Sequence, residues 1–438
     1  MRIRHLTLAL AAAAAFSTGA QAQTEIQWWH SMGGALGDAL NGLANKFNAS
    51  QKEYKVVTTF KGSYPESMTA AIAAYRAGSA PHLLQVFEVG TATMMSAKGA
   101  IVPVTKVMSD AKEPFDPKSY LPAVAGYYTD SKGNMLSFPF NSSTVMFYIN
   151  KDAFKKAGLD PNKAPTTWKE FGAAAEKLKA SGQQCVYTTS WPSWTHIENF
   201  SAWHNVPIGT KENGFGGLDT QFTINSPLHV RHIAMLSDMS KKGLFTYAGR
   251  TNQGDARFSS GECAMFTGST GAQAGIRRAA KFDWSINFLP YHEDVKAAPQ
   301  NSIIGGASVW VMGGKKADEY RGVAKFLTFL SSHAIQMDWH TSTGYVPITE
   351  GAYKVTKASG FYDKDPGAEL AVKQLTNKPP TSNSKGLRFG NFVQGRTVIE
   401  EELEAVFSGK KESKAALDDA VRRGNEILRQ FEAANKAR

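Results

Sequence analysis

The sequence predicts an α/β protein built as two lobes. Three observations indicate this: short apolar runs alternate with stretches of helical periodicity, the alternation begins again after residue 140, and 438 residues suffice for about two to three domains. A strand–helix–strand rhythm is typical of a mostly parallel sheet covered by helices. In open sheets of this kind ligands bind beyond the carboxyl ends of the strands, so the loops that follow strands are where we expect the function.

The first set of elements precedes residue 90. The run IQWW at residues 26–29 indicates a strand, and apolar residues from Leu36 to Phe47 then recur at helical spacing. A strand, a helix and another strand are expected next, at residues 54–60, 68–77 and 83–88. This order predicts one sheet with helices packed on it.

The second set of elements begins after residue 140. Strands are expected at residues 144–149, 185–190, 263–269 and 307–312, and helices at 166–180, 271–280 and 316–330. A threonine opens the helix at 166–180, and a last helix carries apolar residues from Leu417 to Phe431. Two sets of strands predict two α/β lobes.

The N-terminus has the pattern of a secretory signal peptide. Arg2 and Arg4 precede an apolar run from Leu6 to Phe16, and Ala20-Gln21-Ala22 forms an A-x-A cleavage site. The run is too short for a membrane span, which needs roughly 20 apolar residues. We therefore expect residues 1–22 to be removed after Ala22 and the mature protein to be exported.

Export bears on the two cysteines. An oxidising compartment permits one disulfide between Cys185 and Cys263. Two separate buried thiols are the alternative, and the sequence leaves both open.

The net charge of +11 does not indicate a nucleic-acid-binding protein. The lysines and arginines are scattered along the chain with no basic arm or block, so we expect no nucleic-acid partner. Solubility or the handling of small anions accounts for the charge equally well.

A search for enzyme motifs finds none. The chain lacks G-x-S-x-G, H-E-x-x-H and G-x-x-x-x-G-K-[ST], and GFGGLD at residues 214–219 has Asp219 where a dinucleotide loop needs its last glycine. The histidines show no metal-ligand spacing with the cysteines. We expect no catalysis, no cofactor and no metal ion.

Polar loops at the ends of strands are the candidate binding elements. GSTGAQAGI at residues 268–276 places Ser269 and Thr270 between a strand and a helix, where they could cap the helix or help its free N–H groups hold an anion. NSST at 141–144 is a second hydroxyl cluster, and IIGGAS at 303–308 offers a glycine pair for close approach to a ligand.

Aromatic and acidic residues add to these loops. Trp191 and Trp194 lie on a proline-containing loop, where they could pack the lobes or form an apolar wall for a small ligand. Glu88 ends a strand and could accept hydrogen bonds from ligand hydroxyls, or be exposed, or cap the next helix. Tyr345 lies between Gly344 and Pro347 at a joint between helices, as core filler or as a ligand contact.

Several stretches carry a resemblance to a known family. They are WWHSMGGALGDAL, QVFEVGTATMMSAKGAI, FPFNSSTVMFYINKDAFKKAGLDP, ENFSAWHNVP, PQNSIIGGASVWVM, TGYVPIT and NKPPTSNSKGLRFGN, which cover the mature chain from end to end. In these the chain resembles the extracellular solute-binding proteins of ABC importers, the family of maltose-binding protein. Among them it is most similar to the members that take up glycerol phosphates.

The resemblance implies a two-lobed periplasmic-binding-protein fold with a hinge and a ligand cleft. The implied parts are a signal peptide at 1–22, one lobe at 23–138 plus 292–344, and the other at 139–291 plus 345–438. The implied crossings lie near Phe138–Ser143, Leu289–His292 and Tyr345–Thr349. The implied partners are a small-molecule ligand, sn-glycerol-3-phosphate or a diester such as glycerophosphocholine, and the inner-membrane permease with its cytoplasmic ATPase. We expect a monomer.

Nine residues match the ligand positions of the family. They are Tyr64, Glu88, Ser143, Trp191, Trp194, Ser269, Gly306, Tyr345 and Arg396. We expect Arg396 to give the phosphate two forked N–H bonds, and Glu88 to bind glycerol hydroxyls at the other end because a carboxylate repels a phosphate. The other donors to the phosphate are assigned to Ser143, Ser269, Tyr345 and the Gly306 N–H. The apolar wall along the carbon chain is assigned to Trp191 and Trp194.

Two alternatives to this function stay open. The same fold could bind a neutral oligosaccharide, although a sugar site would be expected to hold more carboxylates and no arginine fork. The chain could also be a periplasmic hydrolase of glycerophosphodiesters, in which case it would turn its ligand over.

Overall fold

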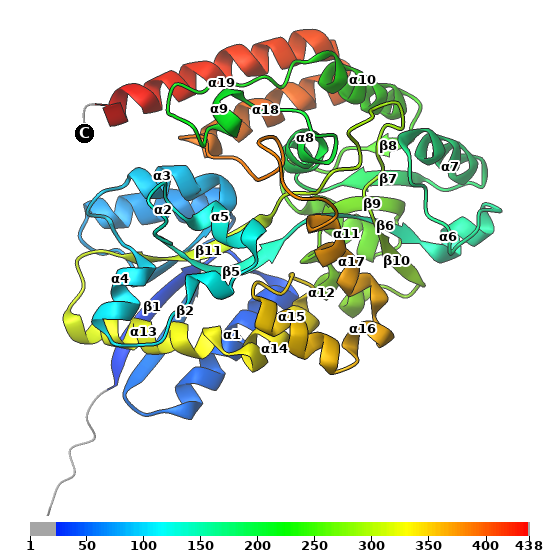
Figure 1. Ribbon diagram of the computed structural model, residues 1–438. Coiled ribbons are helices and arrows are strands. Elements are labelled where there is room, and N and C mark those ends of the chain that lie inside the picture. Colours follow the sequence, from blue (N-terminus) through cyan, green and yellow to red (C-terminus); the bar gives the residue numbers. More distant parts are fainter. Residues whose placement is uncertain (1–22, 437–438) are drawn as a thin grey trace, which may run out of the picture.

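Two β-sheets, each accompanied by helices, make up the protein (Figure 1). The computed structural model describes residues 23–436, so the expected signal peptide and its cleavage site lie outside the described residues. The α/β class and the two-lobed arrangement predicted from the sequence are confirmed. Within residues 23–436, no helix combines the length and the apolar character needed to cross a membrane.

The first sheet has six strands in the order β2-β1-β3-β11-β4, with β5 also paired to β11. Its parallel part is β1, β2 and β3, and β11 runs antiparallel to β3, β4 and β5. The bounds are β1 Thr24–His30, β2 Tyr54–Phe60, β3 Leu83–Phe87, β4 Ile101–Val102, β5 Phe138–Ser143 and β11 Gly305–Met312.

The second sheet has five strands in the order β10-β6-β9-β7-β8. Here β7 is parallel to β8 and β9, whereas β6 is antiparallel to β9 and β10. The bounds are β6 Val145–Asn150, β7 Cys185–Thr189, β8 Phe245–Thr246, β9 Cys263–Ser269 and β10 Trp284–Asn287.

The expectation of mostly parallel sheets is wrong, because both sheets are mixed. The antiparallel members β6 and β11 each enter their sheet from the other sheet: β6 follows β5 directly, and β11 follows β10. A helical crossover within one sheet forces neighbouring strands to be parallel, but a strand that arrives from elsewhere is free of that constraint.

The helices fill most of the chain between these strands. Up to residue 203 they are α1 Gly34–Ser50, α2 Tyr64–Arg76, α3 Thr91–Ser96, α4 Val104–Asp110, α5 Pro122–Tyr128, α6 Lys151–Lys156, α7 Trp168–Ala180 and α8 Phe200–Trp203, with short turns η1 Glu88–Gly90 and η2 Pro117–Ser119 and a π-helical turn η3 Trp194–Asn199. Beyond it they are α9 Thr210–Asn213, α10 Pro227–Lys241, α11 Gln253–Ser259, α12 Ala272–Ala279, α13 Ala317–Ser331, α14 His333–Thr343, α15 Glu350–Ala358, α16 Phe361–Lys364, α17 Pro366–Leu375, α18 Phe392–Phe407 and α19 Ser413–Lys436.

Helix α7 shows how the sequence determines where a helix begins and which of its faces is buried. The Thr167 hydroxyl accepts a hydrogen bond from the Glu170 N–H at 3.2 Å, and the Glu170 carboxylate accepts one from the Thr167 N–H at 3.4 Å. This reciprocal pair is a capping box, and it satisfies N–H groups that the first turn leaves free. The apolar face of the helix, including Phe171 and Leu178, is buried.

The chain passes between the sheets next to the cleft. Thr144 separates β5 from β6, and its hydroxyl donates to the Ser302 hydroxyl at 2.8 Å. A further passage lies beside it, where the Val346 N–H donates to the Ser142 carbonyl at 2.9 Å. The crossings expected near Phe138–Ser143 and Tyr345–Thr349 therefore adjoin each other.

Residues 289–292, where the third crossing is expected, lie beside the second sheet. The Tyr291 carbonyl accepts from the Trp168 N–H at 3.0 Å, and the His292 N–H donates to His204 Nε2 at 2.9 Å. These bonds tie residues 289–292 to α7 and α8, beside the second sheet. The chain then joins the first sheet as β11 at Gly305.

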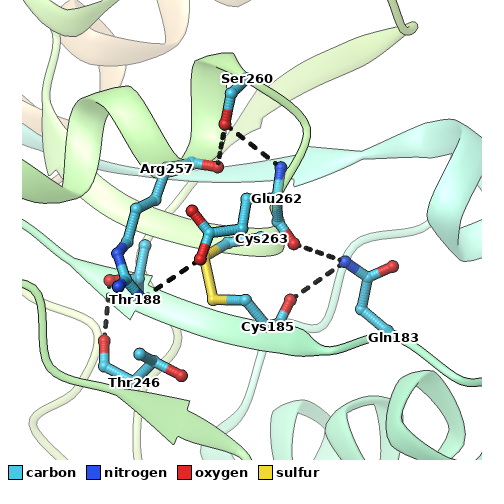
Figure 2. The surroundings of a disulfide bond; sticks show 8 residues. All are labelled: Gln183, Cys185, Thr188, Thr246, Arg257, Ser260, Glu262 and Cys263. Atoms are coloured by element: carbon cyan, nitrogen blue, oxygen red, sulfur yellow. Dashed lines mark hydrogen bonds and ion pairs between the residues drawn. A yellow bond between two sulfur atoms is a disulfide. The ribbon is translucent and has the colours of Figure 1, made fainter.

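Cys185 and Cys263 form a disulfide that links β7 to β9 (Figure 2). The two residues face each other across the parallel ladder, with their Cα atoms 4.4 Å apart. Of the two alternatives that the sequence left open, the bridge is the one observed. Glu262 lies beside the two sulfur atoms, and these three residues are the one group within residues 23–436 close enough to hold a metal ion; both sulfurs are committed to the bridge.

Candidate ligand-binding cleft

A cavity of about 180 Å³ opens between residues of the two sheets, and we call it the central cavity. All nine residues predicted from the sequence line it: Tyr64, Glu88, Ser143, Trp191, Trp194, Ser269, Gly306, Tyr345 and Arg396. The other lining residues are Ser31, Met32, Gly33, Leu36, Ser63, Phe87, Thr251, Asn252, Asp255, Gly271 and Ala272.

Tyr345 is aimed into the central cavity by its neighbours. Gly344 ends α14 in the left-handed conformation (φ 86°), and a Cβ there would lie 2.6 Å from the Thr270 carbonyl oxygen. The Tyr345 ring stacks on Trp339 at 5.9 Å and lies so close to Gly271 that a Cβ on that glycine would meet it at 2.8 Å. Burial raises the pKa of Tyr345 to about 12, so its hydroxyl stays a neutral donor.

Two further hydroxyls come from β5 and from the start of α2. Ser143 ends β5, is buried, and its hydroxyl has no partner within the described residues. The Tyr64 hydroxyl accepts from Asn141 Nδ2 at 3.1 Å, and its ring stacks on Phe87 at 5.2 Å. Burial raises the pKa of Tyr64 well above its usual value, so this hydroxyl also stays neutral.

Ser269 and the start of α12 bring donors from the second sheet. The Ser269 hydroxyl oxygen accepts from the Gly271 N–H at 3.0 Å, which leaves its O–H free to donate. Ala272, the first residue of α12, also lines the central cavity, so the N-terminal end of this helix, with its positive dipole end, adjoins the cavity. We call Tyr64, Ser143, Ser269 and Tyr345 the hydroxyl wall.

Gly306 lets β11 approach this wall. Its φ of 84° lies in the left-handed region, and a Cβ would fall 1.8 Å from the Asn141 carbonyl oxygen. No other residue type fits at this position without moving β5.

The two tryptophans take different roles. Trp194 is buried against Trp203 and Leu289, and its ring covers Gly305 so closely that a Cβ there would lie 2.2 Å from it. Trp191 is less buried and adopts a left-handed backbone (φ 54°), held by its N–H, which donates to the Thr251 carbonyl at 2.9 Å. A non-glycine residue in this region stores strain, which is typical of functional sites.

Arg396 forms a buried ion-pair network with two glutamates. Its Nε and Nη2 donate to the two Glu198 carboxylate oxygens at 2.9 and 2.6 Å, and Nη2 also donates to Glu88 Oε1 at 2.7 Å. All three side chains are buried. We call Glu88, Glu198 and Arg396 the charged corner.

This geometry corrects two assigned roles. The guanidinium fork that we expected to hold a phosphate is occupied by Glu198, because a buried arginine needs a compensating charge. Glu88 is not at the opposite end of the cavity from Arg396 but paired with it. Of the three guanidinium nitrogens of Arg396, only Nη1 has no hydrogen-bond partner among the described residues.

The charged corner carries no excess positive charge. Burial raises the pKa of Glu88, and Arg396 opposes that rise. Burial also lowers the pKa of Arg396, but Glu198 and Glu88 more than compensate, so the guanidinium stays charged. One turn along α18, burial raises the pKa of Glu400 to about 8, so it is mostly neutral at pH 7. A dianion therefore has no electrostatic reason to bind here.

Two carboxylates at or beside the central cavity, Glu198 and Asp255, were not predicted from the sequence. Glu198 lies in the stretch ENFSAWHNVP, and it reaches Arg396 through the π-helical turn η3, which has no sequence signature but is frequent at functional sites. Asp255 stands in the first turn of α11 and accepts from the Ser190 hydroxyl at 2.6 Å. Burial raises its pKa to about 7.

Comparisons with known proteins agree with this architecture. The model of the bacterial extracellular solute-binding protein family matches residues 42–369. The sn-glycerol-3-phosphate-binding periplasmic protein UgpB of Yersinia enterocolitica is 54% identical over 435 residues, 99% of each chain. The protein of the same name from Pectobacterium atrosepticum is 52% identical over 440 residues, covering 100% of this chain and 99% of its own.

Solved structures share the fold. UgpB from Mycobacterium tuberculosis in complex with glycerophosphocholine superposes with a TM-score of 0.78 at 21% identity, covering 93% of this chain and 99% of its own. Maltose-bound MalE3 of T. maritima superposes with a TM-score of 0.76 at 16% identity, covering 92% and 100%. With two sheets around one cavity and full-length relatives above half identity, the chain belongs to the family of bacterial extracellular solute-binding proteins.

Proposed function

We propose that this protein is the periplasmic receptor of an ABC importer for sn-glycerol-3-phosphate and for glycerophosphodiesters such as glycerophosphocholine. It captures the ligand in the central cavity and releases it chemically unchanged to the membrane permease. The observation that carries this proposal is the division of one small cavity into a neutral hydroxyl wall and a charged corner. The names of the full-length relatives support the same ligand.

The phosphate is assigned to the hydroxyl wall. Ser143, Ser269 and Tyr345 can each donate to a phosphate oxygen, and the N-terminus of α12 adds the positive end of a helix dipole. A phosphate monoester carries about −1.5 to −2 charges at neutral pH, so neutral donors bind it without the repulsion that a carboxylate would add.

The glycerol hydroxyls are assigned to the charged corner. A carboxylate such as Glu88 accepts from a hydroxyl, while the free Nη1 of Arg396 donates to one. This assignment keeps Glu88 on the glycerol, as the sequence suggested, and moves Arg396 from the phosphate to the same end. Trp191 and Trp194 would lie along the carbon chain.

The size of the central cavity favours a small ligand over an oligosaccharide. Its volume of about 180 Å³ is below the roughly 300–1,000 Å³ of typical pockets for drug-sized ligands.

Several finer points belong to the same proposal. Residues 1–22 would direct export and be cleaved after Ala22, and the mature protein would act in the periplasm as a monomer. Its partners would be the inner-membrane permease subunits and their cytoplasmic ATPase. The hinge would divide the chain near residues 138, 292 and 345, into one lobe of residues 23–138 plus 292–344 and another of residues 139–291 plus 345–438.

Calorimetric titration of refolded, ligand-free mature protein tests the proposal. Refolding removes ligand carried through purification, and sn-glycerol-3-phosphate, glycerophosphocholine and maltose are injected in parallel. We expect micromolar or tighter binding of the phosphate compounds and no heat from maltose. Heat from maltose with silent phosphate compounds would overturn the proposed ligand, and breakdown of glycerophosphocholine by the sample over hours would make the protein a hydrolase.

A further inference from the structure

Arg388 joins two parts of the chain that lie on opposite sides of the proposed hinge. Its Nη2 donates to the Thr129 carbonyl at 2.7 Å and lies 3.2 and 3.3 Å from the Gly126 and Tyr127 carbonyl oxygens. These oxygens belong to the C-terminal end of α5, which precedes residue 138, whereas Arg388 follows residue 345. Carbonyls at the end of a helix have no partner within it and carry its negative dipole end, so a guanidinium is a favourable partner for them.

Two further contacts across the hinge lie beside this one. Gly386 packs so closely on the Tyr127 ring that a Cβ on the glycine would lie 2.9 Å from it. The Asn391 N–H donates to the Thr93 hydroxyl at 3.1 Å. We call residues 386–391 the clamp segment. None of these six described residues lines the central cavity, so the segment contacts both lobes of the proposed division without contacting a ligand there.

A strained turn holds the backbone of the clamp segment. Residues 211–213 of α9 have left-handed backbones, with φ between 53° and 55°. The Asn213 carbonyl accepts from the Arg388 N–H at 2.8 Å, and Asn213 Nδ2 donates to the Gly386 carbonyl at 3.3 Å. Three consecutive non-glycine residues in this conformation are strained, and they persist only where the surrounding structure holds them, which is typical of functional segments. The strain therefore points to a task for the segment that this turn holds.

The side chain of Arg388 is held from its own side of the hinge. Its guanidinium lies over the Phe215 ring, 4.4 Å from the centroid, and Phe215 belongs to the part between residues 139 and 291. Arg388 forms no ion pair with any residue from 23 to 436. Its bonds across the hinge are therefore to neutral carbonyls alone. Because a hydrogen bond needs roughly 3 Å between its heavy atoms, a small separation of the lobes breaks all of these bonds together.

Resting on the proposed function, we propose that Arg388 is a positioning residue for ligand binding, which clamps α5 to the clamp segment when the lobes close. The hydroxyl wall and the charged corner each draw residues from both lobes, so only the closed form presents them complete. The apparent Kd of a ligand rises as the fraction of protein in the binding-competent form falls. Because Arg388 does not line the cavity, loss of the clamp should weaken every ligand by the same factor.

Calorimetric titration of three variants with sn-glycerol-3-phosphate and glycerophosphocholine tests the clamp. Arg388→Ala removes it, and Arg388→Lys keeps the charge. Lys385→Ala is the matched control, because Lys385 lies over the same Phe215 ring, 4.9 Å from the centroid, but pairs with Glu212 on its own side of the hinge. We expect Arg388→Ala to weaken both ligands about tenfold, the scale of hydrogen bonds to a charged group. Arg388→Lys should fall between Arg388→Ala and wild type, and Lys385→Ala should bind as wild type does.

The two ligands separate the clamp from simple attraction between charges. A phosphate monoester carries about −1.5 to −2 charges at neutral pH, whereas in glycerophosphocholine an ammonium group balances the phosphate. Loss of a distant positive charge would weaken the monoester more than the zwitterion, and Lys385→Ala would have the same effect. Equal factors for both ligands in Arg388→Ala alone indicate the clamp.

Small-angle X-ray scattering gives a readout that does not depend on the ligand. The clamp needs no ligand to form, so it stabilises the closed form of the ligand-free protein as well. We therefore expect ligand-free Arg388→Ala to have a larger radius of gyration than ligand-free wild type, and Lys385→Ala to match wild type. Equal radii for all three proteins would overturn the clamp.

The outcomes separate this inference from the proposed function. If wild type binds neither phosphate compound, the proposed function fails, and the scattering of the ligand-free proteins still decides the clamp. If wild type binds both and Arg388→Ala keeps its affinity, or loses it for one ligand only, the clamp is wrong and the proposed function stands. A lowered melting temperature of Arg388→Ala without a shared loss of affinity would make Arg388 a purely structural residue.

Discussion

At the scale of single residues, buried charge is what organises the cleft. Arg396 lies between Glu88 and Glu198, and all three side chains are buried. Each charge is stabilised by the opposite charge beside it. Removing one member of a buried ion pair is costly because the remaining charge loses its partner. The charged corner is thus both a part of the proposed ligand site and a part of the packing between η1, η3 and α18.

The first prediction concerns this dependence. Arg396→Ala leaves two carboxylates buried without a cation, and we expect it to lower the free energy of unfolding by about 3–5 kcal/mol. Urea unfolding of the ligand-free protein measures the change. Arg278→Ala, which removes an exposed pair with Asp38, is the control and should cost about 0–1 kcal/mol. Equal stability of both variants would contradict the role given to the charged corner.

The second prediction concerns the hydroxyl wall. The Ser143 hydroxyl has no partner among residues 23–436, so Ser143→Ala should leave stability unchanged. It should weaken binding of sn-glycerol-3-phosphate about tenfold or more, as expected for a hydrogen bond to a charged group worth about 1.5–3 kcal/mol. Ser142→Ala, one residue earlier in β5 and outside the cavity lining, is the matched control. A similar loss of affinity in both variants would show that β5, rather than the hydroxyl, had been disturbed.

At the scale of elements, the second sheet is fastened by its disulfide. The bridge from β7 to β9 closes a loop of 78 residues that contains α8 to α11 and the tryptophan loop. Ser269 at the end of β9 and Trp191, two residues after the end of β7, line the central cavity. The bridge therefore fixes one end of the ladder whose other end leads to site residues.

The third prediction follows from that loop. For a loop of this length the chain-entropy relation gives a stabilisation of about 4.5 kcal/mol. The double variant with Cys185→Ser and Cys263→Ser should therefore unfold at a clearly lower urea concentration and bind ligand with nearly unchanged affinity. Addition of a reductant to wild type should reproduce the shift. An unchanged unfolding midpoint would mean that the bridge does not form in the exported protein.

Some strands could be predicted from the sequence and others could not. Strands β3, β6 and β9 were predictable because each is a continuous buried apolar run between turns. Strand β5, FPFNSS, was taken for a crossing because its polar half hides the alternation, although it pairs with β11. The directions of β6 and β11 depend on passages between the sheets, which no local pattern encodes.

The residues of the site were predictable from the sequence, but the contacts among them were not. All nine predicted residues converge on the central cavity, because strand-end loops gather at one edge and the family resemblance fixed which of their residues to choose. The partners of Arg396 could not be predicted. Glu198 comes from a segment distant in sequence and depends on a π-helical turn, and the role of an arginine is decided by the charges that packing brings to it.

At the scale of the whole molecule, buried histidines set the response to pH. Burial lowers the pKa of seven of them far below the usual 6.5, so they stay neutral in the folded protein. The pKa falls to about 3 or 4 for His30, His196, His204, His229, His292 and His340, and it also lies well below 6.5 for His232. Burial acts in the opposite sense on Asp255 and Glu400, whose pKa values rise to about 7 and 8.

The fourth prediction takes its sign from these shifts. Between pH 6.5 and 4 the unfolded chain binds protons at histidines that the folded protein keeps neutral, so stability falls as the pH falls. Asp255 and Glu400 bind protons more readily when folded, so they oppose that fall and make stability decrease again from about pH 7 to 8. The seven histidines outweigh these two carboxyl groups, so the melting temperature should peak near neutral pH and drop steeply toward pH 4. Scanning calorimetry of the ligand-free protein measures it, and a melting temperature that rises toward pH 4 would contradict the histidine account.

The central claim is that one small cavity binds the phosphate of a glycerol phosphate at the hydroxyl wall and its glycerol hydroxyls at the charged corner. A crystal structure of the mature protein with sn-glycerol-3-phosphate tests it most directly. We predict the phosphate within hydrogen-bond distance, roughly 3 Å, of the Ser143 and Ser269 hydroxyls, and the glycerol hydroxyls on Glu88 and Arg396. A phosphate bound by Arg396 in place of Glu198, or a ligand outside the central cavity, would contradict the account.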